Sequence, residues 1–213
     1  MAGSPPDPSR DTPEILHALA GVRIYAQLKP DAAGLAELGR LQWAVRALVP
    51  RTRPVSTGRL HLTLIHFGKA DEAYARLAQA TGVSRQAFSR ALASYLADTE
   101  AALPVRDFLL NPVGLAGFGL NGTTLAVECS PTPELEDVHA VLYALLLEFL
   151  AACGVPESAA YAAQDPALAF SGVLRPHISI LHGFHPPADA AAKLPVPAAE
   201  PLRLHPLPVL YRT

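Results

Sequence analysis

Hydrophobic positions along the chain follow two periods, and each predicts a different kind of element. Short runs of apolar and β-branched residues, bounded by glycine, proline or charge, predict strands. Longer segments whose apolar residues recur every three or four positions predict helices that bury one face. Strands are expected at Val22–Leu28, Arg59–Phe67, Val105–Leu110, Thr123–Cys129, Val173–Leu181 and Leu202–Tyr211, and helices at about Asp31–Leu48, Asp71–Gln79, Ser84–Ala101 and Pro133–Gly154.

Capping and turn residues mark where several of these elements begin and end. Asp31 and Thr132 are suited to cap helices, because their side-chain oxygens accept hydrogen bonds from the first free N–H groups. Pro133 follows at the first helical position, where its missing N–H costs nothing. Gly154 is expected to end the same helix. The glycine-rich segment Gly114–Gly122 is predicted to be a turn region between two strands.

The length suits one folded unit with a loose tail. The 213 residues are enough for one domain, or for two small lobes that fold together. Residues 1–13 are rich in proline and polar side chains, which predicts a loose N-terminal tail before a single bilobal domain over 14–213. Pro206 and Pro208 predict that the last strand lies at a sheet edge or contains a bulge.

Composition excludes several classes of protein. The formal net charge of −2 is far from that of a protein that binds nucleic acid by general attraction, so a phosphate ligand must be held by a few placed groups. The two cysteines, Cys129 and Cys153, form no C-x-x-C motif, which argues against a disulfide scaffold and favours a reducing cytoplasm. The apolar run Val138–Val155 contains His139 and Glu148, so we expect a buried helix and no membrane partner.

One order of elements occurs twice. A strand, a helix and a second strand span Val22–Phe67, and the same order recurs over Thr123–Leu181. The second strand of each unit contains a matching string, which reads His61-Leu62-Thr63-Leu64-Ile65-His66 in the first unit and His177-Ile178-Ser179-Ile180-Leu181-His182 in the second. Two similar halves predict a pseudo-two-fold arrangement.

The repeated string places an imidazole and a hydroxyl together in each half. Residues i and i+2 of a strand share a face, so His61 lies beside Thr63 and His177 beside Ser179. If the halves face each other, two imidazoles flank one space. A neutral imidazole can take a proton from an attacking water while an imidazolium protonates the leaving oxygen of a phosphodiester, and the hydroxyls can donate to the phosphate. The alternative is that these are half-buried histidines with locally satisfied hydroxyls.

The same residues carry a resemblance to a known family. GRLHLTLIHFG (Gly58–Gly68) and RPHISILHGF (Arg175–Phe184) resemble the two H-x-[ST]-x signatures of the 2H phosphoesterase superfamily. More narrowly, they resemble its RNA 2′,3′-cyclic phosphodiesterase branch, whose members are also called 2′-5′ RNA ligases. VRIYAQLKP (Val22–Pro30) resembles the opening strand of that branch.

The resemblance implies a bilobal pseudo-two-fold α+β fold, in which two antiparallel sheets line a central cleft and helices lie outside. It implies metal-independent hydrolysis of 2′,3′-cyclic phosphate ends of RNA or nucleotides, with no cofactor, and a possible reverse 2′-5′ ligation. By position, His61 and His177 become the acid–base pair, and Thr63 and Ser179 the phosphate-binding hydroxyls. We take His177 as the base and His61 as the acid, although the residues do not settle this choice.

Other residues near the two strings are candidates for binding. Arg175 precedes the second histidine and is suited to hold a phosphate, and Tyr25 is suited to stack on a base. His66 and His182 follow the motif histidines by five positions, and odd spacing places them on the opposite face of a regular strand, which argues against a zinc pair.

Two other functions stay open at this point. One is a non-catalytic module that binds RNA or nucleotides, and the other is a metal hydrolase with histidine ligands. We expect a monomer, because the two halves already complete a two-sided site.

Overall fold

The computed structural model describes residues 15–186 and 193–212. The loose tail that the sequence predicts over residues 1–13 lies outside these ranges. Within them the helices are α1 (Ile15–Ala18), α2 (Ala32–Leu48), α3 (Ala70–Thr81), α4 (Arg85–Ala102), α5 (Pro133–Ala152) and α6 (Ser158–Gln164), with 3₁₀ turns η1 (Thr57–Arg59) and η2 (Leu120–Gly122). The strands are β1 (Val22–Pro30), β2 (Arg53–Pro54), β3 (Leu62–Lys69), β4 (Phe108–Leu110), β5 (Pro112–Phe118), β6 (Thr124–Cys129), β7 (His177–His182) and β8 (Leu202–Arg212).

All strands pair antiparallel in one sheet with the order β4-β8-β1-β3-β7-β6-β5, and β2 pairs with β7. The α+β class and the antiparallel strands are therefore as predicted. The first half supplies β1 and β3, the second half supplies β6 and β7, and the halves meet where Leu62 of β3 lies opposite Ile178 of β7. The expectation of two separate sheets is therefore wrong, because the pairing of β3 with β7 joins them into one continuous sheet. In the order β1-β3-β7-β6, the equivalent strands of the two halves lie at equal distances from this central pair.

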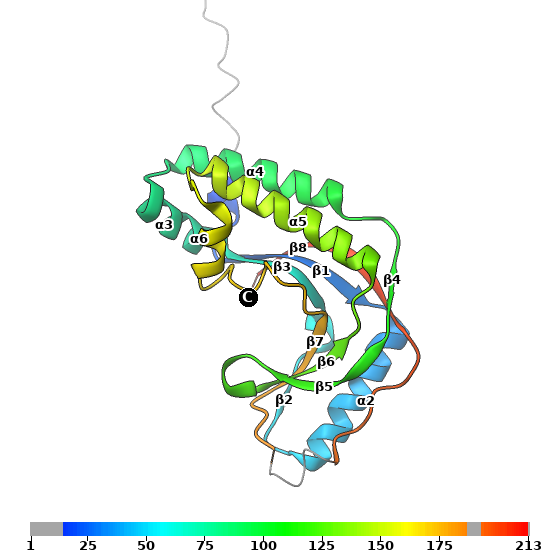
Figure 1. Ribbon diagram of the computed structural model, residues 1–213. Coiled ribbons are helices and arrows are strands. Elements are labelled where there is room, and N and C mark those ends of the chain that lie inside the picture. The colour runs from blue at the N-terminus through cyan, green and yellow to red at the C-terminus, as the bar shows by residue number, and fades with distance from the viewer. Residues whose placement is uncertain (1–14, 187–192, 213) are drawn as a thin grey trace, which may run out of the picture.

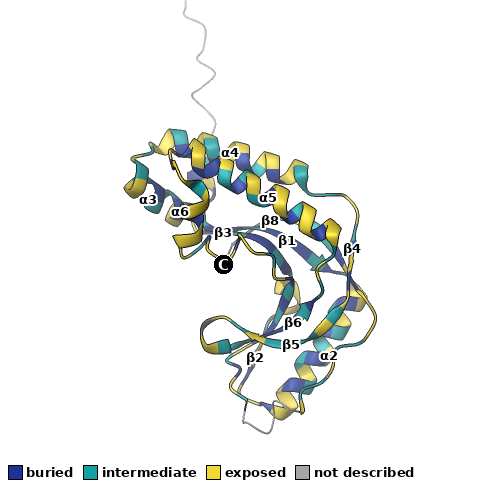
Figure 2. Cartoon of the chain, viewed as in Figure 1, coloured by how far each residue is buried: buried dark blue, intermediate teal, exposed yellow. Residues whose placement is uncertain are grey.

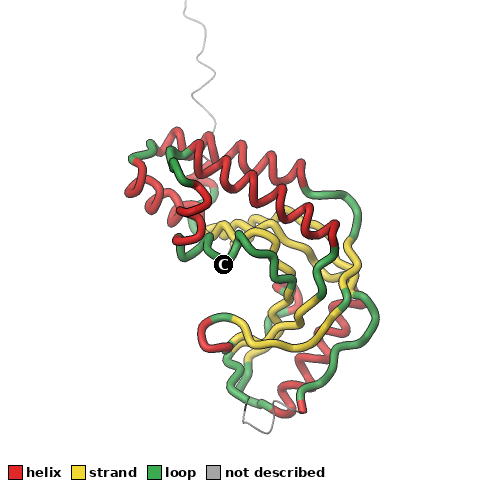
Figure 3. Tube along the Cα trace, in the orientation of Figure 1, coloured by secondary structure: helices red, strands yellow, loops and turns green. Residues whose placement is uncertain are grey.

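The sheet is strongly curved, and the helices lie on its outer side. Figure 1 shows α4 and α5 over the half that contains β1 and β3, and α2 outside the half that contains β6 and β7. The same view coloured by secondary structure shows that the inner, concave side of the sheet carries no helix along its centre (Figure 3). Side chains on that side of the central strands are therefore not covered by a helix layer.

The helix of each half of the repeat packs on a strand of the other half. Helix α2 belongs to the first repeat, yet it contacts β7 of the second, and α5 of the second repeat contacts β3 of the first. Gln42 on α2 donates hydrogen bonds to the carbonyl oxygens of Val55 (2.7 Å) and Ile180 (2.9 Å). The exchanged helices hold the two halves together around the central strand pair.

The core fills the space between the sheet and its helices, and Figure 2 shows the buried residues along these facing surfaces. Alternate residues of the central strands point into it, and Leu62, Ile178 and Ile180 are fully buried. Phe67 continues this layer, because its ring packs on those of Tyr95 and Phe149 at centroid distances of 5.4 and 5.2 Å. No helix in the described part of the chain has both the length and the apolar character needed to cross a membrane.

Several of the predicted boundaries are confirmed. Asp31 caps α2 by accepting a hydrogen bond from the Gly34 N–H at 2.8 Å, and Thr132 caps α5 by accepting one from the Leu135 N–H at 3.3 Å. Gly154 follows α5 with a φ of +85°, a left-handed conformation that favours glycine.

The turn prediction over Gly114–Gly122 is wrong for most of its length. Residues Pro112–Phe118 form β5, which pairs with β6, and the turn is confined to the residues around Asn121. Glycine is uncommon in strands, but here the hairpin requires it, because a Cβ on Gly117 would lie 3.1 Å from the Gly122 carbonyl oxygen. The close approach of the two strands, which no local pattern reveals, decides the conformation.

The edge position predicted for the last strand is confirmed. β4 pairs only with the Leu202–Leu204 part of β8, so among the described strands the segment that contains Pro206 and Pro208 has β1 on one side and a free edge on the other. Proline lacks an N–H and is tolerated at such an edge.

Candidate active site

The two repeated strings lie side by side at the centre of the sheet. With Leu62 opposite Ile178, the antiparallel register places His61 beside Ser179 and Thr63 beside His177. The four side chains share the concave face and are partly exposed, whereas Leu62 and Ile178 between them point into the core. Diagonal neighbours on adjacent strands lie about 7–8 Å apart, a separation that suits two rings on either side of a phosphate.

Both histidine rings are held by the same contact. The Nδ1 atoms of His61 and His177 each lie 2.7 Å from the carbonyl oxygen two residues earlier, which belongs to Arg59 and Arg175 respectively. A carbonyl only accepts, so Nδ1 carries the proton, and Nε2 of the neutral ring keeps its lone pair. β3 and β7 begin later than predicted, at Leu62 and His177, and Arg59 lies in the 3₁₀ turn η1 before β3.

Burial lowers the pKa of both histidines below the ordinary value of 6.5. The hydrogen bond to the backbone carbonyl opposes this effect in each case, and it is the second-largest cause for both rings. In the free protein both rings are therefore more often neutral at neutral pH than exposed histidines are.

A β-bulge lies at the same place in both strings. On β3, Thr63 pairs with Gln27 and Ile65 pairs with Ala26. Gln27 and Ala26 are consecutive on β1, so Leu64 is an extra residue on β3 between their two partners. On β7, Ser179 pairs with Ala126 and Leu181 with Leu125, and the extra residue stands at the equivalent position. A bulge of this kind shifts the alternation of side chains by one position.

The bulges correct the prediction for His66 and His182. Each would point away from the motif histidine in a regular strand, but the shifted alternation returns both to the concave face. The Tyr25 ring demonstrates this for His66, because its centroid lies 5.6 Å from that of His61 and 4.9 Å from that of His66. On the other side, Nδ1 of the exposed His182 lies 3.4 Å from the Thr124 hydroxyl.

His66 forms hydrogen bonds that hold the loop containing Ala167 and Ser171. Its Nδ1 donates to the Ala167 carbonyl oxygen at 2.7 Å, and its backbone N–H and C=O both bond the Ser171 hydroxyl, at 3.3 and 3.1 Å. His139 on α5 bonds the Ser171 carbonyl oxygen at 2.9 Å. Across residues 15–186 and 193–212, no three His, Cys, Asp or Glu side chains gather as a group that could hold a metal ion.

The outer strands of the two halves supply equivalent neighbours for the motif residues. β1 runs beside β3, and β6 runs beside β7, in matching registers. A charged residue lies next to each motif histidine: Lys29 next to His61, and Glu128 next to His177. Two positions along each outer strand, Gln27 lies opposite the Thr63 hydroxyl and Ala126 opposite the Ser179 hydroxyl. Two positions further, Tyr25 lies opposite His66 and Thr124 opposite His182.

The charged pair makes the two histidines different. Lys29 donates to the Gly58 carbonyl oxygen at 2.7 Å, and its positive charge lowers the pKa of His61 further. Glu128 lies opposite His177 and raises the pKa of that ring, although Arg175 opposes it and has the larger effect. Sequence reasoning did not find Lys29 or Glu128. The only local signal was a polar residue at every second position of an otherwise buried β1.

The two predicted binding residues lie at the same face. Tyr25 contacts His61, as described above. The Arg175 side chain is exposed, its guanidinium lies 3.6 Å from the Glu128 carboxylate, and it stands 4.8 Å from the centre of the Phe118 ring. Phe118 itself stacks on His177 at a centroid distance of 4.0 Å and an interplanar angle of 9°, which holds the imidazole plane in place.

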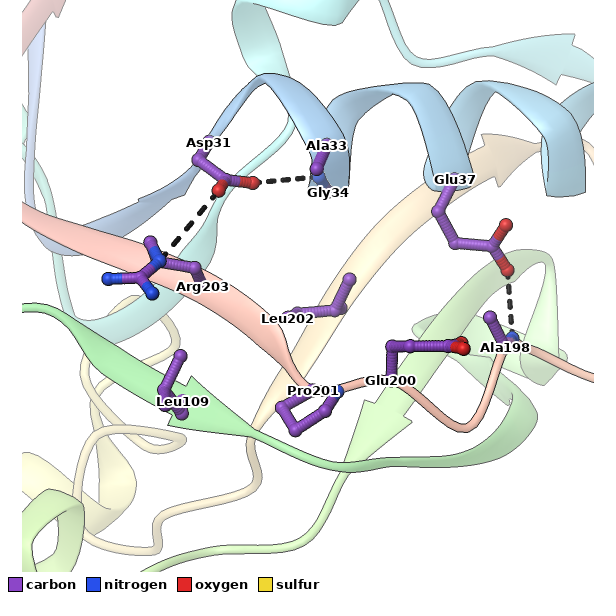
Figure 4. Close-up of a pocket in the computed structure, with 10 residues that line it drawn as sticks. All are labelled: Asp31, Ala33, Gly34, Glu37, Leu109, Ala198, Glu200, Pro201, Leu202 and Arg203. Atoms are coloured by element: carbon purple, nitrogen blue, oxygen red, sulfur yellow. Dashed lines mark hydrogen bonds and ion pairs between the residues drawn. The ribbon is translucent and has the colours of Figure 1, made fainter.

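A separate hollow of about 410 Å³ lies at another edge of the molecule, between α2 and β8. Figure 4 shows that two of the carboxylates lining it are engaged in structural contacts: Asp31 caps α2, and Glu37 accepts a hydrogen bond from the Ala198 N–H at 2.9 Å. Arg203 lies 4.0 Å from Asp31. None of the predicted site residues lines this hollow.

Comparison with known proteins supports the fold. No protein-family model and no curated protein matches the chain. Among solved structures, TT0787 of Thermus thermophilus matches with a TM-score of 0.50 and 20% sequence identity, over 90% of this chain and 81% of that one. E. coli LigT, crystallised as a complex with 3′-AMP, matches with a TM-score of 0.44 and 19% identity, over 90% of this chain and 98% of that one. The curved antiparallel sheet with outer helices is therefore the α+β fold shared with TT0787.

Proposed function

We propose that the chain is a 2H phosphoesterase that hydrolyses 2′,3′-cyclic phosphate ends of RNA or nucleotides without a metal. The observation that carries this proposal is the pair of imidazoles held by identical tethers on one face. Each imidazole lies beside the hydroxyl of the other half, His61 beside Ser179 and His177 beside Thr63. A structural histidine needs no such counterpart, whereas an in-line displacement at phosphorus needs a proton acceptor on one side and a donor on the other.

The reaction follows from this arrangement. One ring, neutral at Nε2, takes a proton from a water molecule as the water oxygen bonds to phosphorus. The bond from phosphorus to one ribose oxygen breaks, and the other ring, protonated at Nε2, delivers its proton to that oxygen. The Thr63 and Ser179 hydroxyls donate to the non-bridging phosphate oxygens, where negative charge increases in the transition state. The product is a nucleotide monoester with a free neighbouring hydroxyl.

Positive charge beside the two rings favours a phosphate over an uncharged ester. Lys29 lies next to His61 and the exposed Arg175 next to His177, so a cation stands on each side of the site. With a net charge of −2 for the chain, this local placement supports a short cyclic end or a mononucleotide as the substrate. Both halves of the site come from one chain, which supports a monomer as the active form.

The test is a screen of 2′,3′-cyclic mononucleotides and of oligonucleotides with cyclic ends, in which the 2′- and 3′-phosphate products are separated by chromatography. We expect turnover that persists after dialysis against EDTA. Binding without turnover of any cyclic phosphate would instead support a non-catalytic module. Activity that disappears with EDTA and returns with a metal would support a metal hydrolase.

The pH dependence distinguishes the two rings. The base must be neutral, so its pKa sets the acidic limb of kcat/KM against pH, and the pKa of the acid sets the alkaline limb. Removing the ammonium in Lys29→Met raises the pKa of His61, and removing the carboxylate in Glu128→Gln lowers the pKa of His177. We therefore expect Lys29→Met to move one limb of the profile of kcat/KM against pH to higher pH, and Glu128→Gln to move the opposite limb to lower pH.

This result also identifies which histidine is the base. The surface ion pair of Lys69 and Glu72, whose atoms lie 2.7 Å apart, provides matched controls, and Lys69→Met or Glu72→Gln should leave both limbs in place. Shifts of the same limb in both site variants would contradict the division of roles.

A further inference from the structure

Gln27 is a buried side chain whose hydrogen-bonding groups are unused. It is 1% exposed, and neither Nε2 nor Oε1 of its carboxamide has a hydrogen-bond partner among the described residues. A buried amide without partners loses the hydrogen bonds that water would give it, so native proteins rarely keep one without a purpose.

Its place in the sheet gives it a specific neighbour. Gln27 lies directly opposite Thr63 across the β1–β3 pair, on the concave face with the two candidate catalytic histidines. The side chains on either side of it on that face are engaged: Lys29 bonds the Gly58 carbonyl oxygen, and Tyr25 packs against the rings of His61 and His66. The unpartnered carboxamide is thus enclosed among the groups of the site.

The other half of the molecule shows that the fold does not need an amide at this position. The equivalent residue of the second half is Ala126, which lies opposite Ser179 and is also buried. The two halves share their register, their bulges and their histidine tethers, yet only the first carries a polar group here. Gln27 is therefore an addition to the Thr63 side of the site and not a requirement of the strand.

We propose that Gln27 is a positioning residue for the Thr63 hydroxyl, an inference that rests on the proposed function. Directly opposite residues in an antiparallel pair have Cβ atoms about 4.5–5.5 Å apart, so rotation about the side-chain bonds of Gln27 brings its N–H groups within reach of Thr63 Oγ1. A hydroxyl donates one hydrogen bond and accepts two. When the amide donates to Oγ1, the hydroxyl proton is directed away from Gln27, toward a phosphate oxygen.

The test compares Gln27→Met, which keeps the length and volume of the side chain but removes its polar atoms, with Thr63→Ala and with the double variant. We expect Gln27→Met to keep or raise the melting temperature, because a buried unpaired amide is removed. We also expect about a tenfold loss of kcat/KM, mainly in kcat, and weaker binding of inorganic phosphate. Because Gln27 acts through Thr63, the double variant should be no worse than Thr63→Ala alone.

Gln42→Met is the matched control, because it removes an amide that holds the Val55 and Ile180 carbonyl oxygens. It should lower the melting temperature. Gln27→Leu repeats the test if the methionine variant does not fold. Unchanged kcat/KM and phosphate affinity in Gln27→Met, or losses that multiply in the double variant, would overturn the proposal.

The two hypotheses fail in different ways. If the wild-type protein turns over no cyclic phosphate, the proposed function fails. The role of Gln27 is then decided by phosphate affinity alone, measured by titration calorimetry on the same four proteins. If the wild type is active and Gln27→Met equals it in both assays, only the role of Gln27 fails.

Discussion

Replacing either His61 or His177 by alanine should lower kcat/KM toward a 2′,3′-cyclic nucleotide by at least about 10²-fold. In the proposed mechanism each ring provides one of the two proton transfers, and a transfer of this kind contributes about 10²–10⁴-fold. Because the tether of each imidazole goes to a carbonyl two residues earlier, its removal leaves the paired strands and the core beneath them in place. The measurement is steady-state turnover, with the melting temperature recorded for each variant.

The control for this pair is His17→Ala, which removes an exposed imidazole on α1, away from the central strands. It should leave kcat/KM unchanged. The double variant His61→Ala/His177→Ala should lose little more than the worse single variant, because the two rings act in one step. Turnover close to that of the wild type in either single variant would refute the two-histidine mechanism.

Removing the hydroxyl of Thr63 or Ser179 has the second-largest expected effect. Donors aimed at a developing negative charge are worth about 10²–10³-fold in kcat, so Thr63→Ala and Ser179→Ala should each lower kcat by about 10²-fold. The effect should fall on kcat more than on KM, because the charge on the phosphate oxygens increases in the transition state. Single-turnover kinetics separate the chemical step from product release.

The conservative exchanges test whether the hydroxyl itself is responsible. Thr63→Ser and Ser179→Thr each keep an O–H at the same position of the strand and should retain most of the activity. A large loss in both exchanges would point to packing as the cause. Full activity in Thr63→Ala and Ser179→Ala would show that the hydroxyls do not contact the phosphate.

Local pattern alone predicted a large part of the molecule. The strand–helix–strand repeat, the caps at Asp31 and Thr132, and the pairing of an imidazole with a hydroxyl in each string were all readable along the chain. These features depend on contacts between residues a few positions apart, such as the hydrogen bond from the Gly34 N–H to Asp31. The alternation of side chains in a strand is equally local, which is why His61 shares a face with Thr63 as expected.

Features that depend on the register between distant segments were not readable. The bulge that returns His66 to the concave face exists because β1 and β3 pair with one residue in excess, and no count along a single strand shows this. The strand formed by Gly114–Phe118 was missed for the same reason, since its close approach to β6 outweighs the low strand preference of glycine.

The sequence by itself determined which residues are candidates for the proposed chemistry and that they occur in two equivalent halves, because both are written within short segments. Only the tertiary structure decided that the two histidine strands pair directly, that Lys29 and Glu128 stand at equivalent places with opposite charge, and that Gln27 is enclosed opposite Thr63. Each of these requires two or more segments, separated by many residues, to meet in one register. That register is selected by the burial of the whole sheet against its exchanged helices and by no local pattern.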